Sequence, residues 1–129
     1  MSAPASLKYS KTHEWVSVDG DTATVGITDF AVQLLSDLVF VDLPKVGRTV
    51  SQSEPFGEIE SVKHVSDLYA PVSGEVIAVN SELPNKLELL NQDPFGGGWM
   101  IKVRMSDAGD LDSLLDVESY QEHCATESH

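Results

Sequence analysis

Short runs of β-branched and aromatic residues alternate with turn residues along most of the chain. Residues 13–18 and 22–27 are two such runs, and they flank the sequence Asp19-Gly20-Asp21. Asp-Gly between two β-runs is a strong signal for a hairpin with a type I′ turn, in which both central residues need positive φ. We therefore predict that the chain opens with a β-hairpin.

A helical period follows this hairpin. The apolar residues that share one face at helical spacing are Ala31, Leu34, Leu35 and Leu38. Thr28, just before them, is a favourable N-cap, and an acidic residue in the first turn supports a helix start there. The pattern predicts a short helix whose apolar stripe packs on the core.

Short β-runs separated by Gly, Pro, Ser and Asn dominate the rest of the chain. They cover residues 39–43, 48–51, 54–62, 65–70, 74–79 and 99–105. Their connections are too short for crossover helices, so we expect antiparallel pairing in a sandwich or a flattened barrel.

Further short helices are expected between and after these runs. Pro84 opens a brief helix with Leu83, Leu87 and Leu90 on one side, and two helices at 107–112 and 114–124 close the chain. Ser113 is the predicted cap of the last helix. The single cysteine, Cys124, lies in an apolar stripe of that helix and is expected to be buried filler without redox chemistry.

Composition and charge narrow the class of protein. With 129 residues, 41% of them hydrophobic, the chain predicts one folded domain at 1–129 with an ordered core at about 7–124. The 21 acidic residues against 8 basic ones give a net charge of −13, which would repel nucleic acid. We expect a monomer.

Neither a membrane span nor a secretory signal is visible. The longest apolar run, from Leu38 to Val41, is far short of the ~20 residues that cross a bilayer. The N-terminal residues lack the basic stretch and apolar core of a secretory signal. We therefore expect a bacterial cytoplasmic protein that does not bind membranes, or a mitochondrial matrix protein if the chain is a processed eukaryotic one.

A search for catalytic and metal-binding motifs finds none that is complete. The pair His13-Glu14 lacks the second histidine of a zinc-binding helix, because the required position holds Ser17. Glu58 and Glu60 lie two residues apart on a predicted strand, which favours a solvated strand face. The sequence therefore predicts neither an enzyme nor a metal site.

Lys63 is the strongest candidate for a functional residue in the sequence. It lies between two β-runs of similar length, so it is expected at the tip of a hairpin. A lysine there protrudes, can be reached by another enzyme and can carry a long covalent group without disturbing the core. On spacing alone, a solvated turn residue without a role is the simpler interpretation.

The sequence around Lys63 resembles the swinging-arm turn of lipoyl and biotinyl domains. The block Glu-Ser-Val-Lys-His at 60–64 is followed by Ala-Pro-Val-Ser-Gly-Glu-Val from residue 70. Biotin carriers usually show Ala-Met-Lys-Met around their lysine, which differs from this block. The segments 12–15, 26–31, 38–44 and 98–103 are similar to the glycine cleavage H-protein family, and the likeness extends from about Leu7 to Cys124.

This resemblance implies a mainly β fold, a hammerhead-like barrel-sandwich hybrid of the lipoyl/biotinyl type with short peripheral helices, including a C-terminal one. It also implies that lipoic acid is attached to Lys63 through an amide by a lipoate-attachment enzyme. The chain would then be a non-catalytic carrier between other proteins. An H-protein-like lipoate relay or donor that is not used in glycine cleavage is the alternative.

The resemblance further implies three enzyme partners. A pyridoxal-phosphate glycine decarboxylase loads an aminomethyl group on the arm, and a tetrahydrofolate-dependent aminomethyltransferase removes it. The flavin enzyme dihydrolipoamide dehydrogenase then takes up the reducing equivalents. Glu14, together with Asp67, is our candidate for holding the charged, loaded arm; the alternative is that Glu14 only decorates a strand edge.

Overall fold

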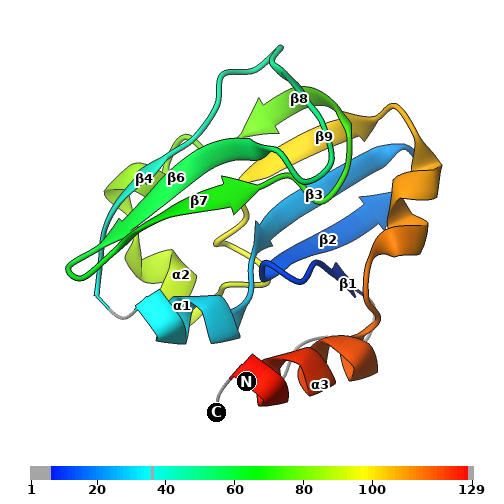
Figure 1. The fold of residues 1–129 in the computed structure, drawn as a ribbon. Coiled ribbons are helices and arrows are strands. Elements are labelled where there is room, and N and C mark those ends of the chain that lie inside the picture. The colour runs from blue at the N-terminus through cyan, green and yellow to red at the C-terminus, as the bar shows by residue number, and fades with distance from the viewer. Residues whose placement is uncertain (1–6, 36, 128–129) are drawn as a thin grey trace.

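Two antiparallel sheets pack against each other in the computed structural model, which describes residues 7–35 and 37–127. The larger sheet contains, in spatial order, β1 (Lys8–Tyr9), β2 (Glu14–Asp19), β3 (Thr22–Ile27), β9 (Ile101–Met105), β8 (Gly74–Val79) and β5 (Thr49–Val50). The smaller sheet contains β4 (Leu38–Asp42), β6 (Pro55–Ser61) and β7 (Val65–Tyr69). Figure 1 shows the two layers and the short helices around them.

The main core lies between the two sheets and follows the period of two. On β3, for example, Ala23, Val25 and Ile27 are buried while Thr22 and Thr24 are only half-buried. Side chains on alternate positions point to opposite faces of a strand, so each sheet contributes one apolar face. The expected mainly β fold with antiparallel strands and peripheral helices is confirmed, and the two sheets remain separate instead of closing into one barrel.

The opening hairpin forms as predicted, but its turn type differs. Asp19 pairs with Thr22, so Gly20 and Asp21 are the two central residues of the turn. Only Gly20, with φ of 64°, has positive φ. This is the pattern of a type II′ turn, in which glycine takes the first central position and the second residue avoids the left-handed region. The type I′ prediction was therefore wrong.

Helix α1 (Asp29–Leu35) begins where the sequence predicted and ends earlier. Thr28 accepts a hydrogen bond from the Ala31 amide at 3.3 Å, as expected of an N-cap. The helix buries Ala31 and Val32, whereas Leu34 is 57% exposed. The predicted stripe was wrong at Leu34, because a helix of two turns buries a narrower face and Leu38 already belongs to β4.

The remaining helices are shorter or shifted relative to prediction. A 3₁₀ turn η1 (Leu83–Asn85) and α2 (Glu88–Gln92) replace the single helix opened by Pro84, and η2 (Ala108–Ser113) is also a 3₁₀ turn. Helix α3 (Val117–Glu127) starts three residues later than expected. Asp116, and not Ser113, caps it by accepting the Ser119 amide at 2.8 Å.

A second apolar cluster attaches α3 to the outer side of the larger sheet. Val16 faces the main core, so its neighbour Trp15 faces the opposite side, where it joins Tyr9 and Tyr120. Cys124 packs against this cluster as expected of filler, but it is half-buried and so less buried than predicted. Among the helices of residues 7–35 and 37–127, none is long and apolar enough to cross a membrane.

Candidate functional site

Lys63 lies at the tip of the hairpin formed by β6 and β7. Glu60 pairs with Val65, and residues 62–64 form the turn between the strands. The lysine side chain is exposed. In Figure 1 this hairpin ends at the edge of the molecule, where other proteins can reach it. The predicted position of Lys63 is therefore confirmed.

The backbone of this turn is fixed by hydrogen bonds while the lysine side chain is free. The buried hydroxyl of Ser61 accepts the His64 amide at 3.0 Å, and the Ser61 amide donates to the His64 carbonyl at 2.8 Å. The Val62 amide donates to the Asp37 carbonyl at 2.9 Å, which joins the tip to the segment between α1 and β4. Ser61 belongs to the motif around Lys63, but the sequence alone does not indicate this role.

A cavity of about 310 Å³ lies beside the tip. Its walls include the apolar side chains of Ile27, Leu35, Ile59 and Leu68. His64, the residue after Lys63, lines the same cavity. The cavity is therefore next to the lysine and mainly apolar, which suits a hydrocarbon chain.

Glu14 lies in the wall of this cavity and is only 1% exposed. Ser10 Oγ donates a hydrogen bond to Oε1 at 2.7 Å, Thr12 Oγ1 donates to the same oxygen, and the Tyr69 amide donates to Oε2 at 3.4 Å. Burial raises the pKa of Glu14 to about 7, against the lowering effect of these hydrogen bonds.

The surroundings of Glu14 do not match a carboxylate on a solvated strand edge. Its partners in the described part of the chain are hydroxyls and an amide, none of which carries a positive charge. A buried carboxylate normally has a cationic partner or neutralises by taking up a proton. The cavity thus holds a carboxyl group whose pKa is raised by burial and which has no cationic partner among the hydrogen bonds of the described residues.

Asp67 lines the cavity as well, but its side chain is exposed. The structure therefore brings Glu14 and Asp67 to one cavity, with Lys63 at the adjacent hairpin tip. The sequence did not reveal Ser10 and Thr12, although hydroxyl residues at alternate positions before Glu14 are a detectable pattern. Among the residues that the structure describes, no three His, Cys, Asp or Glu side chains gather into a metal site.

This arrangement supports one kind of chemistry. An exposed primary amine on a rigid turn can be acylated by another enzyme, and the acylated side chain can lie in a neighbouring apolar cavity. The buried carboxylate can attract a positive charge at the end of such an arm. The geometry therefore favours a covalent carrier over a catalyst.

Known proteins of one family share this sequence and fold. Residues 7–127 match the family described as glycine cleavage H-protein. The chain is 54% identical over 122 residues to the glycine cleavage system H proteins of Bacillus cereus (strain AH187) and Bacillus anthracis (strain A0248), covering 95% of this chain and 96% of each relative.

The solved structures give the same result. The crystal structure of a glycine cleavage system H protein from Mycobacterium marinum superimposes with a TM-score of 0.85 at 38% identity, covering 98% of this chain and 100% of that one. Sequence and fold thus agree over nearly the whole length, and the chain belongs to the glycine cleavage H-protein family.

Proposed function

We propose that Lys63 carries lipoic acid in amide linkage and that the chain is the non-catalytic carrier of glycine cleavage. It takes the aminomethyl group from glycine decarboxylase to the tetrahydrofolate-dependent aminomethyltransferase, and reducing equivalents to dihydrolipoamide dehydrogenase. A lipoate-attachment enzyme modifies the lysine. The observation that carries this proposal is an exposed lysine on a rigid tip beside an apolar cavity with a buried carboxylate.

The residues at the tip and in the cavity fit a lipoyl group. Bound lipoic acid would supply a disulfide, one sulfur of which would carry the aminomethyl group once the disulfide is opened. Amide formation removes the charge of Lys63 and leaves a neutral tether. Leu35, Ile59 and Leu68 offer apolar surface to the hydrocarbon part of that tether.

Glu14 gives the cavity a preference for a loaded arm over an empty one. A primary amine on the arm is cationic, and a carboxylate in a low-dielectric cavity attracts a cation more strongly than one in water. Ser10 and Thr12 keep the carboxylate oriented by donating to it. Asp67, exposed at the cavity, adds a weaker attraction that salt screens.

Reconstituted glycine decarboxylation tests whether the chain is a carrier. Lipoylated protein is expected to support glycine-dependent release of carbon dioxide by glycine decarboxylase and transfer of the one-carbon unit to tetrahydrofolate. Unmodified protein from the same preparation is the matched control and is expected to support neither. A lipoylated chain that stays inactive with both enzymes, yet donates lipoate to another protein, would show a relay instead.

The outer face of the smaller sheet suggests how partners approach the arm. Asp42 pairs with Glu58 across β4 and β6, and Glu58 pairs with Asp67 across β6 and β7. All three side chains are exposed, so they form an acidic row. Like charges directly opposite on neighbouring strands destabilise a sheet, and a basic partner surface would relieve that repulsion. We propose that this row steers basic partner surfaces toward Lys63.

Salt and charge variants test this steering. Raising ionic strength is expected to increase the apparent KM of each enzyme for the carrier, because exposed charges are screened within about 10 Å at 0.1 M salt. The triple variant D42N/E58Q/D67N should show the higher KM already at low salt and respond little to added salt.

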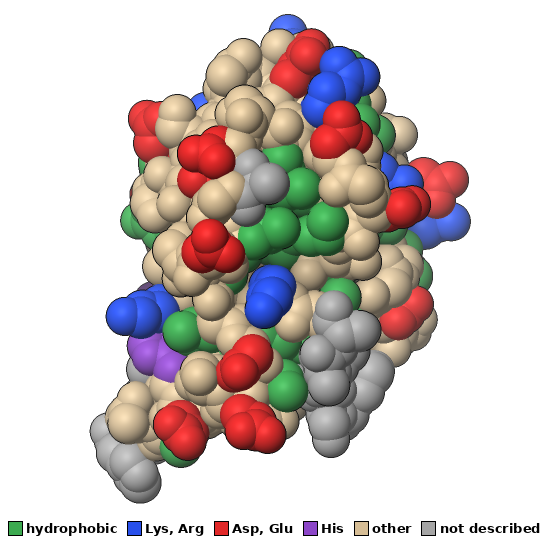
Figure 2. Space-filling view, turned by 90° about the vertical axis from the view of Figure 1, so that its right-hand side faces the viewer, with side chains coloured by type: hydrophobic (Ala, Val, Ile, Leu, Met, Phe, Trp, Pro, Cys, Tyr) green, Lys and Arg blue, Asp and Glu red, His purple; other side chains and the backbone are tan. Residues whose placement is uncertain are grey.

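A control variant separates local steering from net charge. D19N/D21N/E118Q also removes three exposed carboxylates, at the β2–β3 turn and on α3. Acidic side chains also surround an apolar area on the face shown in Figure 2, so the negative surface charge of the chain is not confined to the acidic row. Equal KM values for the two triple variants would contradict steering by the row.

A further inference from the structure

Tyr120 on α3 makes hydrogen-bond contacts with two residues next to the cavity beside Lys63. Its hydroxyl lies 2.8 Å from His13 Nδ1 and 2.6 Å from Thr28 Oγ1. His13 lines the cavity directly, while Thr28 is the N-cap of α1, whose residues Ala31, Leu34 and Leu35 also line it. One hydroxyl thus contacts both a residue that lines the cavity and the residue that caps α1.

This hydroxyl is enclosed and remains protonated. Tyr120 is 2% exposed, and burial raises the pKa of its hydroxyl above the ordinary value for tyrosine. His13 and Thr28 are buried too, and the Thr28 amide donates to the His13 carbonyl at 3.0 Å. The two residues are therefore connected both through the backbone and through Tyr120, away from solvent competition.

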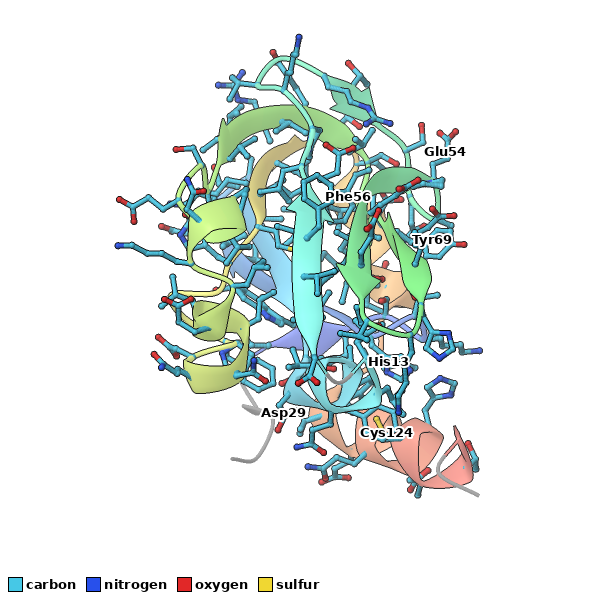
Figure 3. The ribbon with its side chains drawn as sticks, turned by 90° about the vertical axis from the view of Figure 1, so that its left-hand side faces the viewer. His13, Asp29, Glu54, Phe56, Tyr69 and Cys124 are labelled. Atoms are coloured by element: carbon cyan, nitrogen blue, oxygen red, sulfur yellow. The ribbon has the colours of Figure 1, made fainter. Side chains whose placement is uncertain are left out.

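His13 needs such support because of its backbone conformation. Its φ is 75°, in the left-handed region that side chains other than glycine rarely adopt. The ring also packs on Phe30, with centroids 4.9 Å apart, and makes a T-shaped contact with the Tyr120 ring, with centroids 5.7 Å apart. Figure 3 shows His13 close to the junction with α3, where Cys124 also lies.

The conformation of His13 sets the direction of the next residue, Glu14. A change from left-handed to ordinary φ at His13 would redirect the chain just before Glu14, whose carboxylate now faces hydroxyls of Ser10 and Thr12. The C-terminal helix therefore reaches the cavity through a short path: Tyr120, then His13, then Glu14.

We propose that Tyr120 is a positioning residue for the loaded arm. Its hydroxyl keeps His13 in the left-handed conformation that places Glu14 in the cavity, and it ties α1 to the same point. This inference rests on the proposed function, because it assigns α3 a part in protecting the aminomethyl group that the arm carries. Tyr120 touches no cargo itself and acts through His13.

The substitution Y120F isolates the hydroxyl. The phenylalanine ring can still stack on Tyr9, whose centroid lies 4.7 Å from that of Tyr120, so α3 is expected to remain in place. In the unmodified variant, the Glu14 pKa measured by ¹³C NMR should fall from about 7 toward its ordinary value as the carboxylate becomes hydrated. The loaded variant should lose the aminomethyl group about fivefold faster than the parent.

Two further variants make the test specific. D107A removes the side-chain cap of η2, an exposed contact with the Gly109 amide that involves neither Tyr120 nor His13, and serves as a control for a general loss of stability. It should leave the Glu14 pKa and the lifetime of the loaded arm unchanged. If Y120F does not fold, H13N replaces it, because asparagine tolerates left-handed φ while losing the imidazole bond to Tyr120.

The results separate this inference from the proposed function. An unchanged Glu14 pKa or an unchanged loaded lifetime in Y120F would overturn the role of Tyr120. If E14Q, by contrast, still shortens the lifetime of the loaded arm, the proposed function stands without a role for Tyr120. If neither Y120F nor E14Q alters the lifetime, shielding by the cavity is refuted and the inference fails with it.

Discussion

Replacement of Lys63 by arginine is expected to abolish lipoate attachment and, with it, glycine cleavage. Arginine keeps the length and the positive charge, but its guanidinium is not acylated as an amine is. The side chain is exposed and the turn is held by backbone and Ser61 contacts, so the free energy of unfolding should change by less than about 0.5 kcal/mol. Intact mass after incubation with lipoate and its attachment enzyme measures the loss directly.

K45R is the matched control for this variant. Lys45 is also exposed, but it lies between β4 and β5 and away from the β6–β7 turn. It should acquire the full lipoyl mass and support carbon dioxide release at the parent rate. A lipoyl mass on K63R, or glycine turnover by that variant, would contradict the assignment of Lys63.

The place of Lys63 could be predicted because it depends on local sequence. Two β-runs joined by a short turn fold back on each other, so a residue midway between them lies at the tip whatever the rest of the chain does. The opening hairpin was predictable for the same reason, while its turn type depended on a register that placed Gly20 first and Asp21 second.

The cavity beside Lys63 could not be predicted because its walls come from distant parts of the chain. Ile27, Leu35, Ile59 and Leu68 each look like ordinary core residues in the sequence. Only the packing of α1 against strands of both sheets makes them neighbours. Tyr120 likewise precedes Cys124 by four residues and so looks like another member of its helical apolar stripe, while its contact with His13 spans 107 residues.

Errors at the helix ends have a related cause. Ser113 and Asp116 are both good N-caps by residue type, so local propensity cannot choose between them. In the fold, the Ser113 hydroxyl donates to the Asp110 carbonyl at 2.9 Å and accepts from Gln52 at 2.7 Å. These contacts hold Ser113 at the end of η2 and leave Asp116 to cap α3.

The second large effect is expected at Glu14, first in the pH dependence of folding. The folded carboxyl has a pKa of about 7, whereas the unfolded one has its ordinary value of 4.5. Between these values the folded chain binds more protons, so its stability falls as pH rises through that window. The difference corresponds to about 3 kcal/mol of destabilisation above pH 7.

E14Q should remove this pH dependence, because an amide does not titrate in that range. Urea denaturation is expected to give E14Q a higher free energy of unfolding than the parent at pH 8 and a similar one at pH 4. E58Q, which changes an exposed glutamate on β6, is the control and should follow the parent at both values. A parent curve that is flat from pH 4 to pH 8 would contradict the burial of an ionising Glu14.

E14Q should stabilise the fold above pH 7 but make the lipoylated protein lose its aminomethyl group faster. Without a carboxylate to attract the cationic amine, lipoylated E14Q is expected to lose its aminomethyl group about tenfold faster than the parent at pH 8, as for removal of a charged hydrogen-bond partner. The ratio of the two loss rates should approach one as pH falls and Glu14 of the parent becomes protonated. A residue that served folding alone would not make the protein more stable and the cargo less stable when it is replaced. Measuring both quantities on one variant therefore distinguishes a buried carboxylate retained for its cargo from one retained for the fold.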